Sequence, residues 1–235
     1  MNLLAIETST PTGGVALVAD GQLLGSMTIT SQRGHSRLIL PAMETLMKEA
    51  GIGPGDLDVV AATRGPGAFT GVRVGLSLAK GLCLSGTPRL LTVSTLEALA
   101  HRAWCGEQTD YVLPLLNARQ GQVYGAFFRV GASGVGEAEG EEFALTPEDV
   151  LARWPGRCLL AGTGAQVFAD AWEGAGKGQV VWARPERRLP SAESLAFLAL
   201  ERATQGLFED PAAVLPVYLR EATIHRTPKK QQGAF

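Results

Sequence analysis

Short apolar runs alternate with amphipathic stretches along the first half of the chain. Runs bounded by turn residues predict strands, and apolar positions three and four apart predict helices. Asp20-Gly21, between the second and third runs, is a strong hairpin signal, and Ser94-Thr95-Leu96-Glu97 has capping-box spacing. Pro41 predicts an irregular first turn or a kink in its helix. We expect strands at 2–6, 14–18 and 23–29, then a helix at 36–50, a strand at 58–63, a helix at 71–85, a strand at 90–93 and a helix at 94–104.

A similar order of elements restarts after a polar stretch at 106–110. We expect strands at 111–116 and 123–130, a glycine-rich loop at 131–140, a helix at 146–154, a strand at 157–161 and a helix at 191–205. Three strands followed by alternating helices and strands, twice over, predict an α/β protein with the duplicated ribonuclease-H-like fold of actins, sugar kinases and heat-shock ATPases (the ASKHA fold). The predicted parts are an N-terminal lobe at 1–106, a smaller C-terminal lobe at 107–222 and a mobile basic tail at 223–235. Fold analogy alone decides nothing about chemistry.

Composition narrows the class of protein. The chain has 235 residues, of which 46% are hydrophobic and 19% charged, so a substantial core is expected and disorder is not. A net charge of −2 gives no field that attracts nucleic acid. Cys83, Cys105 and Cys158 lie far apart in apolar runs, which predicts buried thiols in a reducing cytoplasm. No apolar run is long enough to span a membrane, and the first residues read as a strand and not as a signal peptide.

Two polar loops are candidates for a phosphate site. Gly65, Gly67 and Gly71 allow a tight turn from a strand into a helix, whose first N–H groups can bind an anion. The segment lacks the Gly-Lys-Ser/Thr of a Walker loop. In the other loop Ser9 stands where kinases of this fold carry glycine, so we favour a structural role over nucleotide binding. The candidate loop residues are Glu7, Thr8, Ser9, Thr10, Gly65, Pro66, Gly67, Thr70, Gly71 and Arg73.

No catalytic or metal-binding residue stands out. His35, His101 and His225 are not spaced as metal ligands, and no Gly-x-Ser-x-Gly elbow anchors a triad. A peptidase is therefore not supported, and we expect no metal and no cofactor.

The first two helices carry more apolar surface than one sheet face can cover. The helix at 71–85 is apolar on nearly all sides, and Gly71, Gly75 and Ala79 recur four apart, which lets another helix approach closely. The two helices could simply bury each other, but we favour a protein–protein interface. Its candidate residues are Ile39, Ala42, Met43, Leu46, Met47, Val72, Gly75, Leu76, Ala79, Leu82 and Cys83.

Several motifs carry a resemblance to a known family. Leu-Ala-Ile-Glu-Thr-Ser-Thr near the start, His35-Ser36, Arg64 to Arg73, the segment 117–124 and Pro216 to Arg220 resemble the TsaB (YeaZ) family, over residues 2 to about 220. The resemblance implies a subunit that is not catalytic on its own, in the bacterial complex that forms threonylcarbamoyladenosine. That modification lies beside the anticodon of tRNAs reading codons that start with adenosine.

The resemblance also implies partners. These are the transferase subunit TsaD, bound as a heterodimer through the first two helices, and the ATPase TsaE. It implies a homodimer in isolation, and contact with tRNA only through the complex. The two loops would then be vestigial phosphate loops. TsaD itself has a His-x-x-x-His pair and a Ser-Gly-Gly-His loop, whereas this chain has a single histidine in 94–101 and Asn117-Ala118-Arg119-Gln120. The alternative is a small ASKHA-type kinase or ATPase with its own nucleotide site.

Overall fold

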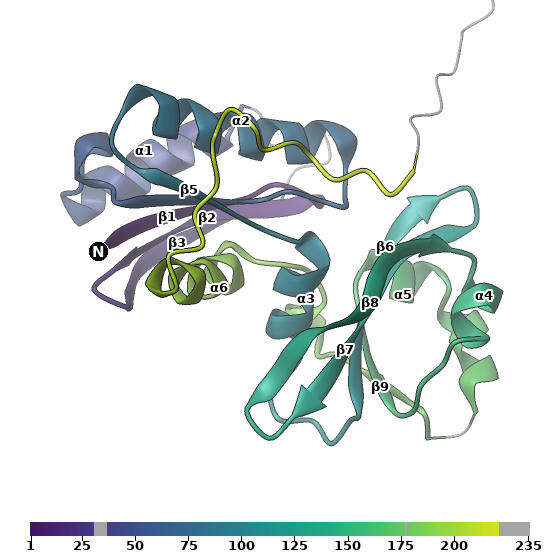
Figure 1. The fold of residues 1–235 in the computed structure, drawn as a ribbon. Coiled ribbons are helices and arrows are strands. Elements are labelled where there is room, and N and C mark those ends of the chain that lie inside the picture. Colours follow the sequence, from purple (N-terminus) through teal and green to yellow (C-terminus); the bar gives the residue numbers. More distant parts are fainter. Residues whose placement is uncertain (31–36, 177, 221–235) are drawn as a thin grey trace, which may run out of the picture.

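The computed structural model describes residues 1–30, 37–176 and 178–220. Within them lie two mixed five-stranded sheets, one in each lobe (Figure 1). The first sheet has the order β3-β2-β1-β4-β5, formed by β1 (Asn2–Glu7), β2 (Thr12–Ala19), β3 (Gln22–Thr30), β4 (Val59–Thr63) and β5 (Arg89–Val93). The second has the order β8-β7-β6-β9-β10, formed by β6 (Tyr111–Arg119), β7 (Gln122–Gly131), β8 (Gly134–Leu145), β9 (Cys158–Ala161) and β10 (Val180–Trp182).

The two sheets share one topology. In each, two antiparallel pairings join the first three strands, and the fourth strand pairs parallel with the first. The predicted duplicated ribonuclease-H-like fold is therefore confirmed. The helices are α1 (Ile39–Ala50), α2 (Phe69–Ser85), α3 (Thr95–Ala103), α4 (Pro147–Leu151), α5 (Thr163–Val167) and α6 (Ala192–Thr204), with short 3-10 helices η1 (Pro54–Asp56), η2 (Ala169–Ala175) and η3 (Pro185–Arg187).

The lobes exchange helices across their junction. Helices α1 and α2 cover one face of the first sheet, whereas α6, which comes late in the chain, covers the other (Figure 1). Helix α3, which follows β5, packs against the second sheet instead. Arg202 of α6 donates to the carboxylate of Glu97 on α3 at 2.7 Å, which ties the two exchanged helices together. By its packing, α6 therefore belongs with the first sheet, although the predicted boundary at residue 106 assigns it to the second lobe by sequence.

Local sequence signals explain several element ends. Asp20 and Gly21 both have positive φ, as the predicted hairpin turn requires. Helix α1 begins at Ile39, so Pro41 lies in the first turn, where its missing N–H removes no intrahelical bond. The predicted start of this helix at Ser36 lies outside the described residues, as does His35. Ser94 caps α3 by accepting from the Leu96 N–H, but Glu97 pairs with Arg202 of α6.

One predicted element is wrong. Residues 131–140 were expected to form a loop, but β8 begins at Gly134 and pairs with β7 along most of its length. The glycines mark the tight turn at 131–134 and irregular pairings within the ladder. Cross-strand contacts compensate for them, because Glu139 of β8 accepts from the Tyr111 hydroxyl and pairs with Arg129. The helix at 146–154 is also shorter than expected and ends at Leu151.

The cysteines only partly match the expectation. Cys83 and Cys158 are buried, and burial raises the thiol pKa to about 11 and about 12 respectively. Cys105 is exposed, which corrects the prediction that all three are buried. It follows the end of α3, where its backbone N–H donates to Glu107. None of the helices in the described ranges is long and apolar enough to cross a membrane.

We expect one fast-reacting thiol in the folded chain. At pH 8 a thiol with a pKa of about 11 is thiolate for roughly one part in a thousand, and burial adds a steric barrier. The hydrogen bond that the Cys105 thiol donates to Glu107 raises the pKa of this thiol too, but Cys105 is exposed. Titration with a chromogenic disulfide should therefore label Cys105 before the other two thiols, and Cys83 and Cys158 only after denaturation. A Cys105→Ser variant that still reacts quickly without denaturant would contradict this assignment.

Candidate functional site

The two polar loops singled out in the sequence lie against each other at one end of the first sheet. The Thr8 hydroxyl donates to the Gly71 carbonyl at 2.7 Å, and the Ala68 N–H donates to the Ser9 carbonyl at 2.8 Å. A Cβ on Gly71 would lie only 2.1 Å from the Thr8 carbonyl oxygen. On Gly67 it would lie 2.5 Å from that of Ser9. The glycines are thus required because the first loop occupies the space beside them.

The polar groups of the first loop point into their own chain. Glu7 is buried, and its carboxylate accepts from the Ser9 N–H at 2.7 Å and from the Ser9 hydroxyl. The Thr10 hydroxyl donates to the Thr12 carbonyl at 2.6 Å. In a phosphate site these donors would have to face the ligand. Their inward direction favours the structural interpretation of this loop.

The remaining candidates of the glycine-rich segment divide into buried and exposed residues. Gly65 and Pro66 are buried, and Thr70 is exposed in the first turn of α2. Arg73 is exposed, but it is engaged: its guanidinium lies 3.7 Å above the Phe69 ring, and its Nε donates to the Tyr218 hydroxyl at 2.7 Å. Arg73 therefore orders a contact with the C-terminal segment.

The turn between β6 and β7 is the second lobe's counterpart of the first loop. Asn117 stabilises this turn, because its side-chain oxygen accepts from the Arg119 N–H at 2.8 Å while its backbone N–H donates to the Thr163 hydroxyl.

A hydrogen bond also joins the two lobes at Ser94, which precedes α3. The Ser94 hydroxyl donates to the carboxyl group of Glu142 on β8 of the second lobe. Burial is the main reason that the pKa of Glu142 is raised, against the opposing effect of this hydrogen bond.

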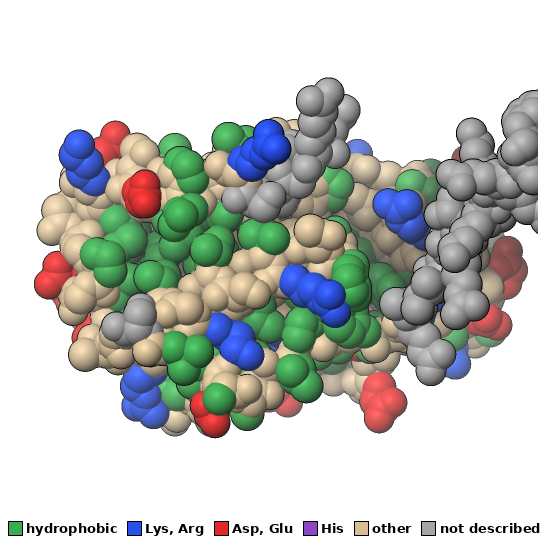
Figure 2. All heavy atoms as spheres, turned by 90° about the horizontal axis from the view of Figure 1, so that it is seen from above, with side chains coloured by type: hydrophobic (Ala, Val, Ile, Leu, Met, Phe, Trp, Pro, Cys, Tyr) green, Lys and Arg blue, Asp and Glu red, His purple; other side chains and the backbone are tan. Residues whose placement is uncertain are grey.

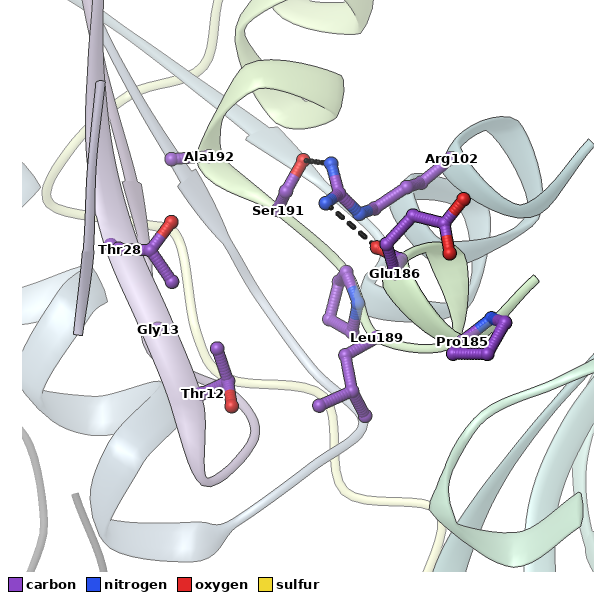
Figure 3. A pocket seen from close by; sticks show the side chains of 11 residues that line it. Thr12, Gly13, Thr28, Arg102, Pro185, Glu186, Leu189, Ser191 and Ala192 are labelled. Carbon is purple, nitrogen blue, oxygen red and sulfur yellow. Dashed lines mark hydrogen bonds between the residues drawn. The ribbon is translucent and has the colours of Figure 1, made fainter. Parts of the chain in front are cut away.

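A pocket of about 240 Å³ lies between the β2–β3 hairpin and the segment that leads into α6 (Figure 3). Thr12 and Thr28 lie on one side of it and Arg102 on the other. The guanidinium of Arg102 donates to the Ser191 hydroxyl at 2.6 Å and to the Glu186 carbonyl at 3.0 Å, as the dashed lines show. Arg102 therefore fastens η3 and the start of α6 to the end of α3. Nothing in the sequence singled out this pocket.

The side chains named as interface candidates do not form the outer surface of α1 and α2. Ala79 is 0% exposed, and eight others are buried with it beneath the helices: Ile39, Ala42, Met43, Leu46, Met47, Val72, Leu76 and Cys83. Leu82 is half-buried and packs against the same core. Gly75 is the place where Thr8 approaches, since a Cβ there would lie 2.3 Å from the Thr8 hydroxyl. The close approach predicted from Gly71 and Gly75 is thus made by a loop of the same chain.

A different set of residues faces outward. We call it the outer helix face, and it consists of Leu38 at the start of α1, Leu40 of α1, and Phe69, Ser77, Gly81 and Leu84 of α2. All are exposed, and Leu84 is 67% exposed. Figure 2, which looks onto this side of the molecule, shows hydrophobic side chains spread over the two helices with a few charged side chains of both signs among them. An interface on these helices would be built from this face.

Metal ligands do not gather in the described part of the chain, where no group of three or more His, Cys, Asp and Glu side chains could hold an ion. His101 is half-buried on α3, and burial lowers its pKa. His225 lies outside the described residues.

Comparison with known proteins identifies the family. The chain is 34% identical to the tRNA threonylcarbamoyladenosine biosynthesis protein TsaB of Escherichia coli (strain K12), over 94% of this chain and 95% of that protein. The chain belongs to the TsaB family. The solved structure of YeaZ from Pseudomonas aeruginosa matches it with a TM-score of 0.80 and 33% identity, covering 93% of this chain and 99% of that one. These matches confirm the predicted resemblance to the TsaB (YeaZ) family.

The TsaB family is also related to a transferase family. Residues 23–166 match the family model described as TsaD: tRNA N6-adenosine threonylcarbamoyltransferase. The tRNA N6-adenosine threonylcarbamoyltransferase of Nitratidesulfovibrio vulgaris (strain DP4) is 32% identical over 72% of this chain, but that match covers only 53% of the transferase. The match with the Escherichia coli TsaB therefore covers nearly the full length of both proteins, whereas the match with the transferase covers about half of that protein.

The loop contact can be tested by adding one methyl group to α2. Gly71→Ala forces a Cβ against the Thr8 carbonyl, so we expect a loss of about 1–3 kcal/mol in the free energy of unfolding. The matched control is Gly55→Ala in the short helix η1, away from the outer surface of α1 and α2, where the added Cβ meets nothing within 4 Å. It should change the free energy of unfolding by less than about 0.5 kcal/mol. Urea unfolding followed by circular dichroism measures both, and equal effects of the two substitutions would refute the contact.

Proposed function

We propose that this chain is a non-catalytic subunit required to form threonylcarbamoyladenosine beside the anticodon of tRNAs that read codons starting with adenosine. The observation that carries the proposal is the match with TsaB over nearly the full length of both chains. The match with the transferase is partial by comparison. The match thus extends over nearly all of the biosynthesis protein but over only about half of the transferase.

The loop geometry supports a subunit without catalysis of its own. The Thr8, Ser9 and Thr10 hydroxyls are directed at groups of the same chain, and the glycines at 67 and 71 accommodate backbone in place of a ligand. The ASKHA fold is kept while the loops fasten the sheet to α2. On this proposal the chain acts through a partner and is neither a peptidase nor a free-standing ATPase.

The outer helix face is the surface that we assign to the partner TsaD. It combines exposed apolar side chains, such as Leu40 and Leu84, with the small residues Ser77 and Gly81. Exposed apolar area marks interaction sites, and small residues four apart allow a second helix to come close. The same face can pair with a second copy around a two-fold axis, because such an interface uses one patch twice. We propose that the isolated chain is a homodimer, that TsaD replaces one copy, and that TsaE joins the resulting heterodimer.

Ser77→Arg tests the partner surface without entering the core. Ser77 is exposed, so the free energy of unfolding should change by less than about 0.5 kcal/mol. A large charged side chain at a close helix contact should weaken both homodimer formation and TsaD binding by tenfold or more, or about 1.4 kcal/mol. Sedimentation equilibrium and isothermal titration with purified TsaD provide the two measurements.

The matched control is Val167→Glu, which places a charge on an exposed apolar residue of the second lobe. It should leave both associations unchanged. If Ser77→Arg and Leu84→Glu both stay dimeric and bind TsaD normally, the partner binds elsewhere on the chain.

The proposed function itself is tested in cells. Depletion of this chain should remove threonylcarbamoyladenosine from bulk tRNA, as measured by nucleoside mass spectrometry, and the wild-type chain should restore it. The basic tail lies outside the described residues, and we expect a chain lacking residues 226–235 to restore the modification as well. So few charges give little phosphate affinity at physiological salt. Unchanged modification after complete depletion would rule out the function, whereas a tail-less chain that fails to complement would assign the tail a contact with tRNA or a partner.

A further inference from the structure

The last described segment, residues 207–220, runs from the end of α6 past β5 and α2 to the second lobe (Figure 1). We call this segment the clasp. Its first anchor is at β5, where the Glu209 N–H donates to the Leu90 carbonyl at 3.0 Å. The Glu209 carboxylate accepts from the Thr92 N–H at 2.6 Å and from the Thr92 hydroxyl at 3.0 Å. The clasp therefore begins as a short extension of the first sheet.

Helix α2 supplies the second anchor. Lys80 donates to the Val214 carbonyl at 2.9 Å, and Arg73 donates to the Tyr218 hydroxyl at 2.7 Å. The Tyr218 and Phe69 rings lie 5.2 Å apart between centroids. Phe69 belongs to the outer helix face, and Leu215 of the clasp is 73% exposed. The clasp thus forms one border of the outer helix face.

The third anchor is the glycine-rich segment. The Val217 N–H donates to the Arg64 carbonyl at 2.7 Å. Gly65 has a φ of 104°, and a Cβ there would lie 2.7 Å from the Val217 carbonyl oxygen. Only glycine fits this backbone conformation beside the clasp without strain.

The clasp ends on the second lobe. The Arg220 guanidinium donates to the Ala118 carbonyl at 2.8 Å, to the Arg119 carbonyl at 3.3 Å, and to the side-chain oxygen of Gln120. Ala118 and Arg119 are the last residues of β6, and Gln120 lies in the turn between β6 and β7. A guanidinium suits this task because its planar fork presents several donors in fixed directions.

We propose that the clasp couples the outer helix face to the orientation of the second lobe, with Arg220 as its positioning residue. One end of this connection is Phe69 and Arg73 on α2, and the other is the β6–β7 turn. Helices α3 and α6 join the lobes at their junction, and the clasp adds a link between α2 and that turn. A partner bound to the outer helix face contacts the clasp, so its binding and the lobe orientation are linked in both directions. The coupling to a partner, but not the lobe contact, rests on the proposed function.

The lobe orientation can be measured directly. Spin labels at Glu49→Cys on α1 and Glu148→Cys on α4, in a Cys105→Ser background, report the distance between the lobes. Arg220→Ala should broaden the distance distribution and speed amide exchange in the β6–β7 turn about tenfold. Arg220→Lys should lie between Arg220→Ala and the wild type, since lysine keeps the charge but loses the fork. The control Arg153→Ala, at an exposed arginine just beyond α4, should match the wild type.

A second variant covers the case in which Arg220→Ala disturbs folding. Val217→Pro removes the N–H that donates to Arg64 and leaves every side chain of the second lobe intact. It should broaden the same distance distribution. Wild-type distances in both folded variants would overturn the proposal.

The coupling is tested by TsaD binding. Arg220→Ala should weaken TsaD affinity about fivefold or more, although Arg220 lies outside the outer helix face. Broadened lobe distances with wild-type TsaD affinity would overturn the coupling. Failure of the proposed partner surface is recognised separately, because Ser77→Arg would then leave TsaD binding intact while Arg220→Ala still changes the lobe distances.

Discussion

The contact between the β1–β2 loop and the glycines of α2 is the constraint on which the rest of the structure depends. The Thr8 carbonyl occupies the place of a Cβ on Gly71, and the Thr8 hydroxyl occupies that of Gly75. Helix α2 therefore packs closely against the end of the first sheet. Its position fixes where Phe69 and Arg73 meet the clasp and which side chains form the outer helix face. The β1–β2 loop thus positions a helix.

The two lobes are interlocked because each sheet is covered by a helix from the other half of the chain. Helix α3 packs on the second sheet and α6 on the first, so neither sheet has a complete core without a helix from the other half of the chain. The Arg202–Glu97 pair joins these helices at the junction, and Arg220 adds a contact where the clasp meets the β6–β7 turn. Two separate connections resist bending better than one. The orientation of the two lobes is therefore held both at the junction and at the β6–β7 turn.

Sequence patterns predicted most of this fold because the relevant signals are local. The hairpin turn at Asp20-Gly21 depends only on the φ angles of these two residues. The cap at Ser94 depends only on the nearby N–H of Leu96. The second half was less predictable because its elements depend on distant partners. Strand β8 contains glycines that signal a loop, and its pairing with β7 overrides them. Cys105 lies in an apolar run yet is exposed, since α3 ends just before it.

The candidate site shows why pattern alone could find α2 but not orient it. A helix that is apolar on nearly all sides has no polar stripe to mark its outer surface. Glycines four apart signal a close neighbour without identifying it, and here that neighbour is Thr8 of the same chain. The residues first assigned to the interface therefore lie in the core, and the exposed small residues Ser77 and Gly81 lie on the other side of the helix. The loop hydroxyls are bonded within their own chain, and the exposed side of α2 is the surface that the proposed partner would use.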